Sequence, residues 1–194
     1  RVAYERGDER IVSANEIHLP AGEPVEFVLT TADVIHSFWM PAIGGKMDMM
    51  PGRVNRLTLT PTTPGLYRGA CAEFCGPSHA LMAFAIVVHP PGEFDDWLVA
   101  ETSPASNSAE TEGRRLFLAN GCAACHRIGG IVELGEVGPD LTHVGSRRTL
   151  AAGTAPMSRQ ALTDWITDPQ ALKPGAGMPA YTMLPEEEIL AIAD

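Results

Sequence analysis

The sequence predicts a chain of two domains, an all-β sandwich followed by a small all-α domain. The first part contains short segments in which apolar and polar residues alternate, as half-buried strands do, for example 25–30 and 54–60. Small polar residues then fill 102–108, a composition typical of linkers. After the linker, the spacing of apolar residues becomes helical. We therefore expect a β domain over 1–92, a short helix and linker over 93–108, and a helical domain over 109–194.

Turn residues separate the expected strands of the first domain. The dipeptide Pro51-Gly52 precedes the alternating segment 54–60, and the Pro- and Gly-containing segment 61–65 follows it. Segment 83–89 (AFAIVVH) is a continuous apolar run rich in β-branched residues, which is typical of a fully buried strand. Short strands punctuated by glycine and proline favour an antiparallel sandwich.

Helical patterns mark the remainder of the chain. Segment 93–101 predicts a short helix with Phe94, Trp97 and Leu98 on one face. A further helix is expected to begin at Pro185, because proline suits the first turn and the three glutamates that follow suit the positive end of the helix dipole. The other expected helices of the second domain are 112–119 and 159–167, the latter ended by Pro169.

Composition excludes several classes of protein. Apolar residues make up 45% and charged residues 20% of the 194 residues, which indicates a globular chain. Lys and Arg number 14 against 24 Asp and Glu, a net charge of −10, so we expect no nucleic-acid partner. The longest apolar run, 80–88, is far shorter than the roughly 20 residues that span a bilayer.

The two ends of the sequence suggest a piece of a longer protein. It opens without an initiator methionine or a signal-peptide pattern, and it ends inside an expected helix. We therefore expect a soluble fragment whose missing N-terminal segment carries a membrane anchor.

The four cysteines form two close pairs, Cys71/Cys75 and Cys122/Cys125. A disulfide framework is the alternative, and four cysteines allow three pairings. A histidine follows each pair closely, which favours cofactor anchors over disulfides.

The second pair belongs to a C-x-x-C-H motif formed by Cys122, Cys125 and His126. Residues three apart on a helical turn share a face, so both thiols can add to the two vinyl groups of one haem, with the histidine below the iron. A zinc site would need a second cysteine pair at suitable spacing, and a thioredoxin-like site would need a βαβ setting. We therefore expect a covalent haem.

The other axial ligand of this haem is expected downstream. Met178 lies in the loop 173–179, which is too rich in glycine and proline for a helix. A buried loop methionine is usually core filler, but a six-coordinate iron needs a further ligand. Met157 and Met183 are the weaker candidates.

Residues 110–194 resemble the class I c-type cytochromes. The C-x-x-C-H motif, the segment 138–141 and Met178 stand in the order of that family. The resemblance implies that the carbonyl of Pro139 accepts a hydrogen bond from Nδ1 of His126 and so orients the imidazole. It also implies a longer C-terminal helix than 185–194 provides.

The first cysteine pair lies in a segment, 71–82, that also contains an imidazole and a thioether, His79 and Met82. Thiolate, thioether and imidazole together select copper in a redox role, whereas zinc has no use for the thioether. A mononuclear blue-copper site takes one cysteine, but two cysteines can bridge two metals. His36 can supply a second imidazole from a neighbouring strand or loop.

Two other groups of residues could be read as sites. We expect Met47, Met49 and Met50 to pack against a neighbouring surface, and the alternative is that they form a Cu(I)-binding cluster. Ordinary structural roles are expected for His18, His89 and His143, which have no partner pattern.

Nearly all of residues 1–90 resemble subunit II of haem-copper cytochrome c oxidases, through segments 36–39, 46–53 and 71–82. With the fused cytochrome, the chain is similar to subunit II of caa-type bacterial oxidases. The resemblance implies a cupredoxin-like Greek-key sandwich that holds a binuclear copper centre, CuA. It also implies the copper ligands: bridging Cys71 and Cys75, terminal His36, His79 and Met82, and the backbone carbonyl of Glu73. The Glu73 carboxylate is expected to bind Mg²⁺ or Mn²⁺ facing subunit I.

The same resemblance implies a function. The chain is expected to be the electron-entry subunit of cytochrome c oxidase, a proton-translocating oxidoreductase, with no catalytic residue or complete O₂-reducing site of its own. Electrons would pass from cytochrome c or another donor through haem c and CuA to the haem of subunit I. The expected location is the periplasmic or outer face of a bacterial cytoplasmic membrane. The alternatives are the CuA domain of a nitrous oxide or nitric oxide reductase, and a free periplasmic electron carrier.

Overall fold

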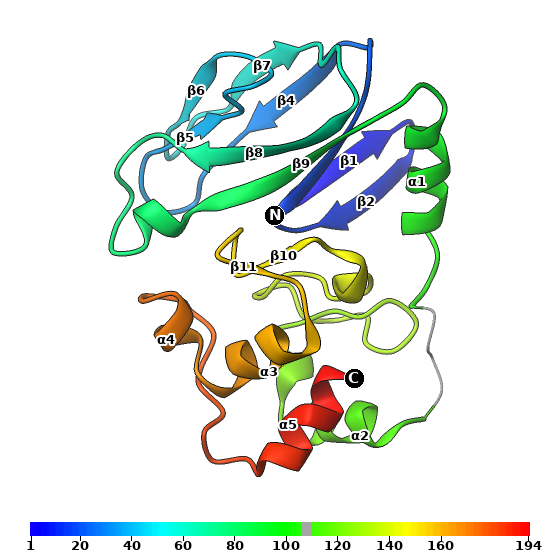
Figure 1. The fold of residues 1–194 in the computed structure, drawn as a ribbon, viewed down its shortest axis with the longest axis vertical. Helices are drawn as coiled ribbons and strands as arrows, with labels where there is room; N and C mark the ends of the chain where they lie inside the picture. Colours follow the sequence, from blue (N-terminus) through cyan, green and yellow to red (C-terminus); the bar gives the residue numbers. More distant parts are fainter. Residues whose placement is uncertain (106–109) are drawn as a thin grey trace.

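The computed structural model describes residues 1–105 and 110–194, and it confirms the expected fold class, a β sandwich followed by a helical domain (Figure 1). Helix α1 (Glu93–Glu101) flanks the sandwich and occupies the segment predicted for it. Residues 106–108 of the expected linker and the expected domain start at 109 lie outside the described residues. Within the described part of the chain, we find no helix that is both long and apolar enough to cross a membrane.

The sandwich is a mixed rather than a purely antiparallel structure. Its strands are β1 (Val2–Arg6), β2 (Glu9–Ser13), β3 (Glu16–Pro20), β4 (Val25–Leu29), β5 (His36–Trp39), β6 (Lys46–Met49), β7 (Asn55–Leu59), β8 (Gly65–Cys71) and β9 (Ala83–His89). One sheet has the order β3-β9-β8-β5-β6, β4 pairs with β7, and β1 pairs with β2. The expectation of antiparallel strands is wrong for β3, which runs parallel to β9. Apolar and polar residues alternate in the same way in parallel and antiparallel strands, so the sequence pattern does not reveal the direction of β3.

The core of the sandwich lies beneath β3 and β9. The fully buried apolar side chains there are Ile17, Leu19, Met40, Ile86 and Val88. The predicted strand 83–89 supplies two of them and occupies the position of β9 next to β8. Burial of this apolar surface provides the main stabilisation of the domain.

One glycine sets the spacing of the strands that carry the first cysteine pair. A Cβ atom at Gly69 would lie 2.1 Å from the ring of Phe84, so only glycine lets that ring lie across β8. The ring of Phe84 stacks in turn on Phe38, with centroids 5.2 Å apart and planes 5° apart. This stack locks β5, β8 and β9 in register just below the loop 71–82.

The second domain consists of short helices joined by long loops. Its elements are α2 (Glu112–Ala119), α3 (Arg159–Thr167), α4 (Pro169–Leu172), α5 (Glu186–Ala193), the hairpin β10 (Thr149–Leu150) and β11 (Ala155–Pro156), and the 3₁₀ turns η2 (Cys122–Ala124) and η3 (Val144–Ser146). Side-chain caps begin three helices, at Thr111, Ser158 and Asp168. Pro169 stands at the first position of α4, which explains why it ends α3.

Helix α5 docks closely on α2. A Cβ atom at Gly113 would lie 1.9 Å from the carbonyl oxygen of Ala191, so the two helix backbones touch there. This contact holds α5 in place.

Two of the histidines expected to have ordinary structural roles, His18 and His89, form a half-buried cluster next to the second domain. Nδ1 of His18 lies 2.7 Å from Nε2 of His89, and its Nε2 lies 2.8 Å from a carboxylate oxygen of Glu16. The ring of His18 stacks on Trp97 of α1, with centroids 3.9 Å apart. The other oxygen of Glu16 accepts the backbone N–H of Arg148, at 2.9 Å, and so joins the two domains.

Candidate copper and haem centres

The first candidate site is the loop 71–82, which is anchored at both ends. The backbone N–H of Cys71 donates to the carbonyl of Met82, at 2.9 Å, where β8 ends and β9 begins. The next residue, Ala72, donates to the carbonyl of Ser37, at 2.9 Å, and Ser37 is fully buried in β5. These two bonds close the loop and tie it to the strand that carries His36.

The sulfur of Cys71 is one centre of the donor cluster. It lies 3.7 Å from Nδ1 of His36, 3.1 Å from the carbonyl oxygen of Glu73 and 3.7 Å from the sulfur of Cys75. The structure therefore brings the upstream imidazole to the cysteine pair, as the sequence predicts.

The sulfur of Cys75 is the other centre. It lies 3.5 Å from Nδ1 of His79 and 3.6 Å from the sulfur of Met82. The 3₁₀ turn η1 (His79–Leu81) places these two donors. His79 begins the turn and Met82 directly follows it, so both side chains lie close to the sulfur of Cys75. Of the six expected copper donors, four thus surround the sulfurs of the other two, Cys71 and Cys75.

This donor set fits a pair of copper ions. The two sulfurs are too far apart for a disulfide, whose S–S bond is about 2.05 Å, and both thiols are free. Ligand atoms of His36, Cys71 and Cys75 lie within 4.8 Å of one another, close enough to share a metal. Soft sulfur and imidazole donors are the set that copper prefers.

The two thiols differ in acidity. Burial would raise the pKa of Cys71, but backbone hydrogen bonds at Ser37 and Glu73 and the His36 imidazole outweigh it and lower the pKa to about 7. Burial and the neighbouring Cys71 raise the pKa of Cys75 to about 11. One thiolate is therefore available near neutral pH, and binding of a metal cation would displace the second proton.

Asp33 is a site residue that sequence reasoning missed. Its carboxylate lies 3.0 Å from Nε2 of His36, which leaves Nδ1 facing the sulfur of Cys71. The hydrogen bonds from His36 and then Thr31 lower the pKa of Asp33 to about 2. A carboxylate that holds a ligand imidazole in this way fixes its orientation. The available signal was an acidic residue three positions before a candidate ligand.

Two other expected features near the copper loop stay predictions. The side chain of Glu73 is exposed, and the described residues place no partner on its carboxylate. The methionines at 47, 49 and 50 are half-buried on and just after β6, where Met49 is paired with His36 across the strands.

The second candidate site is the C-x-x-C-H motif. Its first three residues form the turn η2, and the carbonyl of Cys122 accepts the N–H groups of Cys125 and His126, at 3.1 and 3.0 Å. Nδ1 of His126 lies 2.8 Å from the carbonyl oxygen of Pro139, the contact that the cytochrome resemblance implies. The imidazole is therefore oriented with Nε2 as its free ligand atom.

Two glycines form a cradle around this imidazole. A Cβ atom at Gly138 would lie 2.4 Å from Cε1 of His126, and one at Gly135 would lie 2.6 Å from the backbone of the same residue. The N–H of Gly138 donates to the carbonyl of Cys125, at 2.7 Å, which holds the segment against the motif. Only glycine lets the backbone of this segment lie so close to the imidazole.

One buried donor next to this segment, Nε of Arg147, lacks a partner among the described residues. Arg147 is tied to the residue after Pro139, because its guanidinium donates to the carbonyl of Asp140, at 2.5 Å. A haem carries two carboxylates, which are acceptors of the kind that this donor lacks. The residues present therefore fit a haem.

Exposure separates Met183 from the other two candidate axial methionines and does not distinguish Met178 from Met157. Met178 is partly buried in the segment between α4 and α5, whereas Met183 is 73% exposed. Met157 is partly buried beside β11, at the start of the segment that leads to α3. Among the described residues, no polar contact joins Met178 to His126, so its role stays a prediction.

Comparisons with known proteins agree with this geometry. Residues 2–89 match the family "Cytochrome C oxidase subunit II, periplasmic domain", and residues 110–194 match the family "Cytochrome c". Cytochrome c oxidase subunit 2 of Alkalihalophilus pseudofirmus is 39% identical over 97% of this chain and 55% of its own length. The subunit 2 of Bacillus subtilis is 32% identical over 97% of this chain and 56% of its own length.

A solved structure, the periplasmic domain of subunit II of cytochrome oxidase from Bradyrhizobium japonicum, is 32% identical, with a TM-score of 0.45, over 52% of this chain and 84% of that one. The chain spans about half the length of the full-length relatives it matches. Both halves of the chain are nevertheless matched, in the same order, by relatives that align over nearly all of it. The chain therefore belongs to the cytochrome c oxidase subunit II family, in the form in which a CuA domain is followed by a cytochrome c domain.

Proposed function

We propose that this chain is the electron-entry subunit of a respiratory terminal oxidase. It would take electrons from cytochrome c or another donor and deliver them toward the haem of subunit I, where O₂ is reduced. The observation that carries the proposal is the gathering of four further copper donors around the sulfurs of Cys71 and Cys75, in a chain whose second domain presents a C-x-x-C-H motif. We assign the O₂-reducing site to subunit I and no catalytic residue to this chain.

The chain's own residues hold and orient the carriers. Two copper ions and one covalent haem would supply one-electron redox chemistry when bound. We propose these copper ligands: His36, Cys71, Cys75, His79, Met82 and the carbonyl of Glu73. We propose these haem contacts: covalent attachment through Cys122 and Cys125, and iron ligation by His126 and Met178. Asp33 and Pro139 orient one ligand imidazole in each centre, so neither ligand must reorganise when the charge of its metal changes.

We place both domains on the periplasmic or outer face of a bacterial cytoplasmic membrane, against subunit I. The family that matches the first domain is described as a periplasmic domain, which supports this location. The exposed carboxylate of Glu73, next to the copper cluster, would bind Mg²⁺ or Mn²⁺ at the contact with subunit I. The net charge of −10 favours a cationic electron donor.

Metal analysis combined with electron paramagnetic resonance of the oxidised chain tests the proposal. We expect two coppers for each covalent haem, and hyperfine structure from one unpaired electron shared over two copper nuclei. A single copper with a four-line pattern, or zinc in its place, would contradict the binuclear centre and favour a simpler redox carrier.

A further inference from the structure

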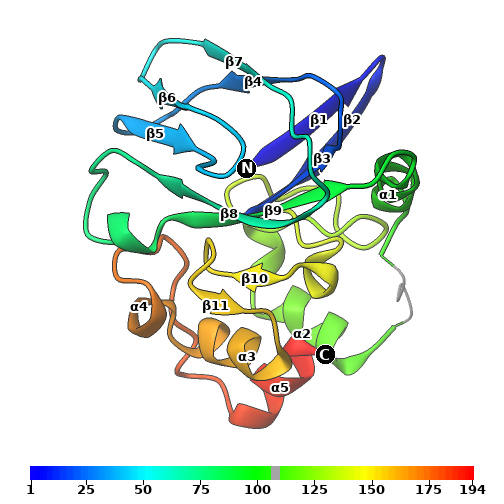
Figure 2. The same cartoon turned by 45° about the horizontal axis from the view of Figure 1, so that its top comes forward.

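The two domains meet directly at the copper-ligand loop 71–82. Figure 2 shows the hairpin β10–β11 and the segment that follows α4 lying beneath β8, β9 and the turn between them. Oγ of Ser78 donates to the carbonyl of Pro174, and Cγ of Pro77 lies 4.0 Å from the Cβ position of Gly175. The segment that carries Met178 therefore touches the segment that carries His79 and Met82.

Lys173 stands at the centre of this contact. Its ammonium lies 3.3 Å from the carbonyl oxygen of Leu81 and 3.2 Å from that of Ala151, so one cation joins a carbonyl from each domain. The side chain is half-buried, and burial lowers its pKa. It is also one of only two lysines in the chain.

The backbone that receives Lys173 is strained. Ala151 and Ala152 have φ of 54° and 59°, and Gly153 follows with φ of 77°. Left-handed backbone is unfavourable for alanine and persists only where surrounding contacts hold it. Here it aims the carbonyl of Ala151 at Lys173 and that of Ala152 at the N–H of Ala83, at 2.9 Å, across the domain boundary.

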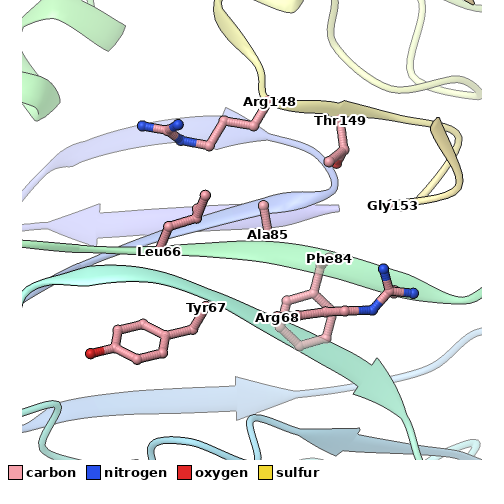
Figure 3. A pocket seen from close by; sticks show the side chains of 9 residues that line it. Leu66, Tyr67, Arg68, Phe84, Ala85, Arg148, Thr149 and Gly153 are labelled. Atoms are coloured by element: carbon pink, nitrogen blue, oxygen red, sulfur yellow. The ribbon is translucent and has the colours of Figure 1, made fainter. Parts of the chain in front are cut away.

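A cleft opens in another part of the boundary. Figure 3 shows it between the domains, with Arg148, Thr149 and Gly153 on one side and Arg68 and Phe84 on the other. Its volume is about 330 Å³. Domains without a large apolar interface are expected to move relative to one another unless specific contacts hold them. The bond between Glu16 and Arg148 is one such contact, and the polar contacts around Lys173 are those that lie at the copper-ligand loop.

We propose that Lys173 is a positioning residue that fixes the Met178 segment against the copper-ligand loop. Leu81, whose carbonyl accepts the ammonium, directly precedes the copper ligand Met82, and Met178 follows Lys173 by five residues. The contact thus keeps the two ligand segments in one relative position while electrons pass between the domains. The role of this contact in electron transfer rests on the proposed function. The contact itself does not depend on bound metals.

Amide hydrogen exchange in the metal-loaded chain tests the proposal at single-residue resolution. The N–H of Ala83 is bonded across the boundary to Ala152, whereas that of Ala85 is bonded within the copper domain to Asn15, at 3.1 Å. In Lys173→Met, loss of a charge-assisted hydrogen bond is expected to raise the exchange rate of Ala83 roughly tenfold. The rate of Ala85 stays unchanged.

Two further variants complete the test. Lys46→Met, at an exposed position of β6, removes the same charge and leaves both exchange rates as they are. Lys173→Arg keeps the cation and restores most of the protection of Ala83. An unchanged Ala83 rate in Lys173→Met would overturn the proposal, and so would an equal increase at Ala85, because the copper domain itself would then have loosened.

A redox titration supplies a second readout. The Lys173 ammonium lies 3.3 Å from the carbonyl oxygen of Leu81, the residue before the proposed copper ligand Met82, so it favours the reduced copper pair, which carries less positive charge. We expect a lower copper reduction potential in Lys173→Met than in Lys46→Met, and equal potentials would count against this position of the ammonium. Failure of the proposed function would appear separately, as loss of copper or haem in the unmodified chain.

Discussion

The copper centre and the haem centre are built in contrasting ways. Five of the six copper donors lie within one loop of 12 residues that hydrogen bonds close at both ends. The haem centre instead draws its proposed contacts from the dispersed segments 122–126, 138–139 and 178, with the buried and unpartnered Nε of Arg147 nearby. We therefore expect the sandwich to hold its copper ligands in place without copper, and the second domain to depend on its haem for stability.

Removal of the haem attachment should have the largest effect. In the double variant Cys122→Ser and Cys125→Ser, the second domain should lose most of the roughly 5–15 kcal/mol that stabilises a typical domain. Circular dichroism during thermal unfolding would show loss of the helical signal at low temperature. A copper-depleted chain is the matched control, and its sandwich should stay folded. Equal losses in both samples would break the comparison.

Cys75→Ser should remove the binuclear copper centre and leave the haem intact. The hydroxyl that replaces the thiol is a hard donor and a poor bridge between copper ions. Copper content and the paramagnetic resonance signal of the shared electron should both fall, while the haem absorption spectrum serves as the internal control. Survival of two coppers with the same signal would show that Cys75 does not bridge.

Met178→Ala should lower the haem reduction potential without detaching the haem. Loss of a thioether ligand removes a donor that stabilises reduced iron. Met183→Ala is the matched control, because Met183 is 73% exposed. A spectroscopic redox titration of both variants would decide between them. The assignment fails if only Met183→Ala shifts the potential.

Asp33→Asn should weaken copper binding moderately, by roughly 10- to 100-fold in affinity, as is usual when the partner of a ligand histidine is lost. The carboxylate fixes the imidazole of His36 with Nδ1 toward Cys71. Competition with a copper chelator would measure the change, with exposed Asp8→Asn as the control. If the copper affinity of Asp33→Asn equalled that of the control, strand β5 alone would orient His36 and the role of Asp33 would be refuted.

Glu16→Gln should have the smallest effect, about 1–2 kcal/mol, on the stability of the docked chain. Burial would raise the pKa of Glu16, but hydrogen bonds from His18 and the Arg148 N–H outweigh it and leave the pKa below its ordinary 4.5. Because the folded-state pKa is lowered, the contribution is present above 4.5 and is lost as pH falls through the folded value. Melting temperatures of both proteins against pH should converge in acid. A constant difference would rule out the carboxylate's charge as the cause.

From the sequence, the ligand residues could be predicted more fully than the residues and strand pairings that hold those ligands in position. Cys71, Cys75, His79 and Met82 are recognisable together because they are close in sequence and chemically unusual. Asp33 was missed, because an exposed acidic residue has no special pattern until its distance to His36 is known. The parallel pairing of β3 with β9 was missed for a related reason, since alternation gives no strand direction.

The amino-acid sequence by itself determined the order of the domains, the helix caps and the set of groups able to hold copper and haem. Local spacing is enough for these features, because a turn, a cap or a C-x-x-C-H motif depends on a few neighbouring residues. Only the tertiary structure decided which distant groups meet, such as Glu16 with Arg148 and Lys173 with Leu81. Such contacts join residues about 90 or more positions apart, and they depend on how whole domains pack, which no local pattern records.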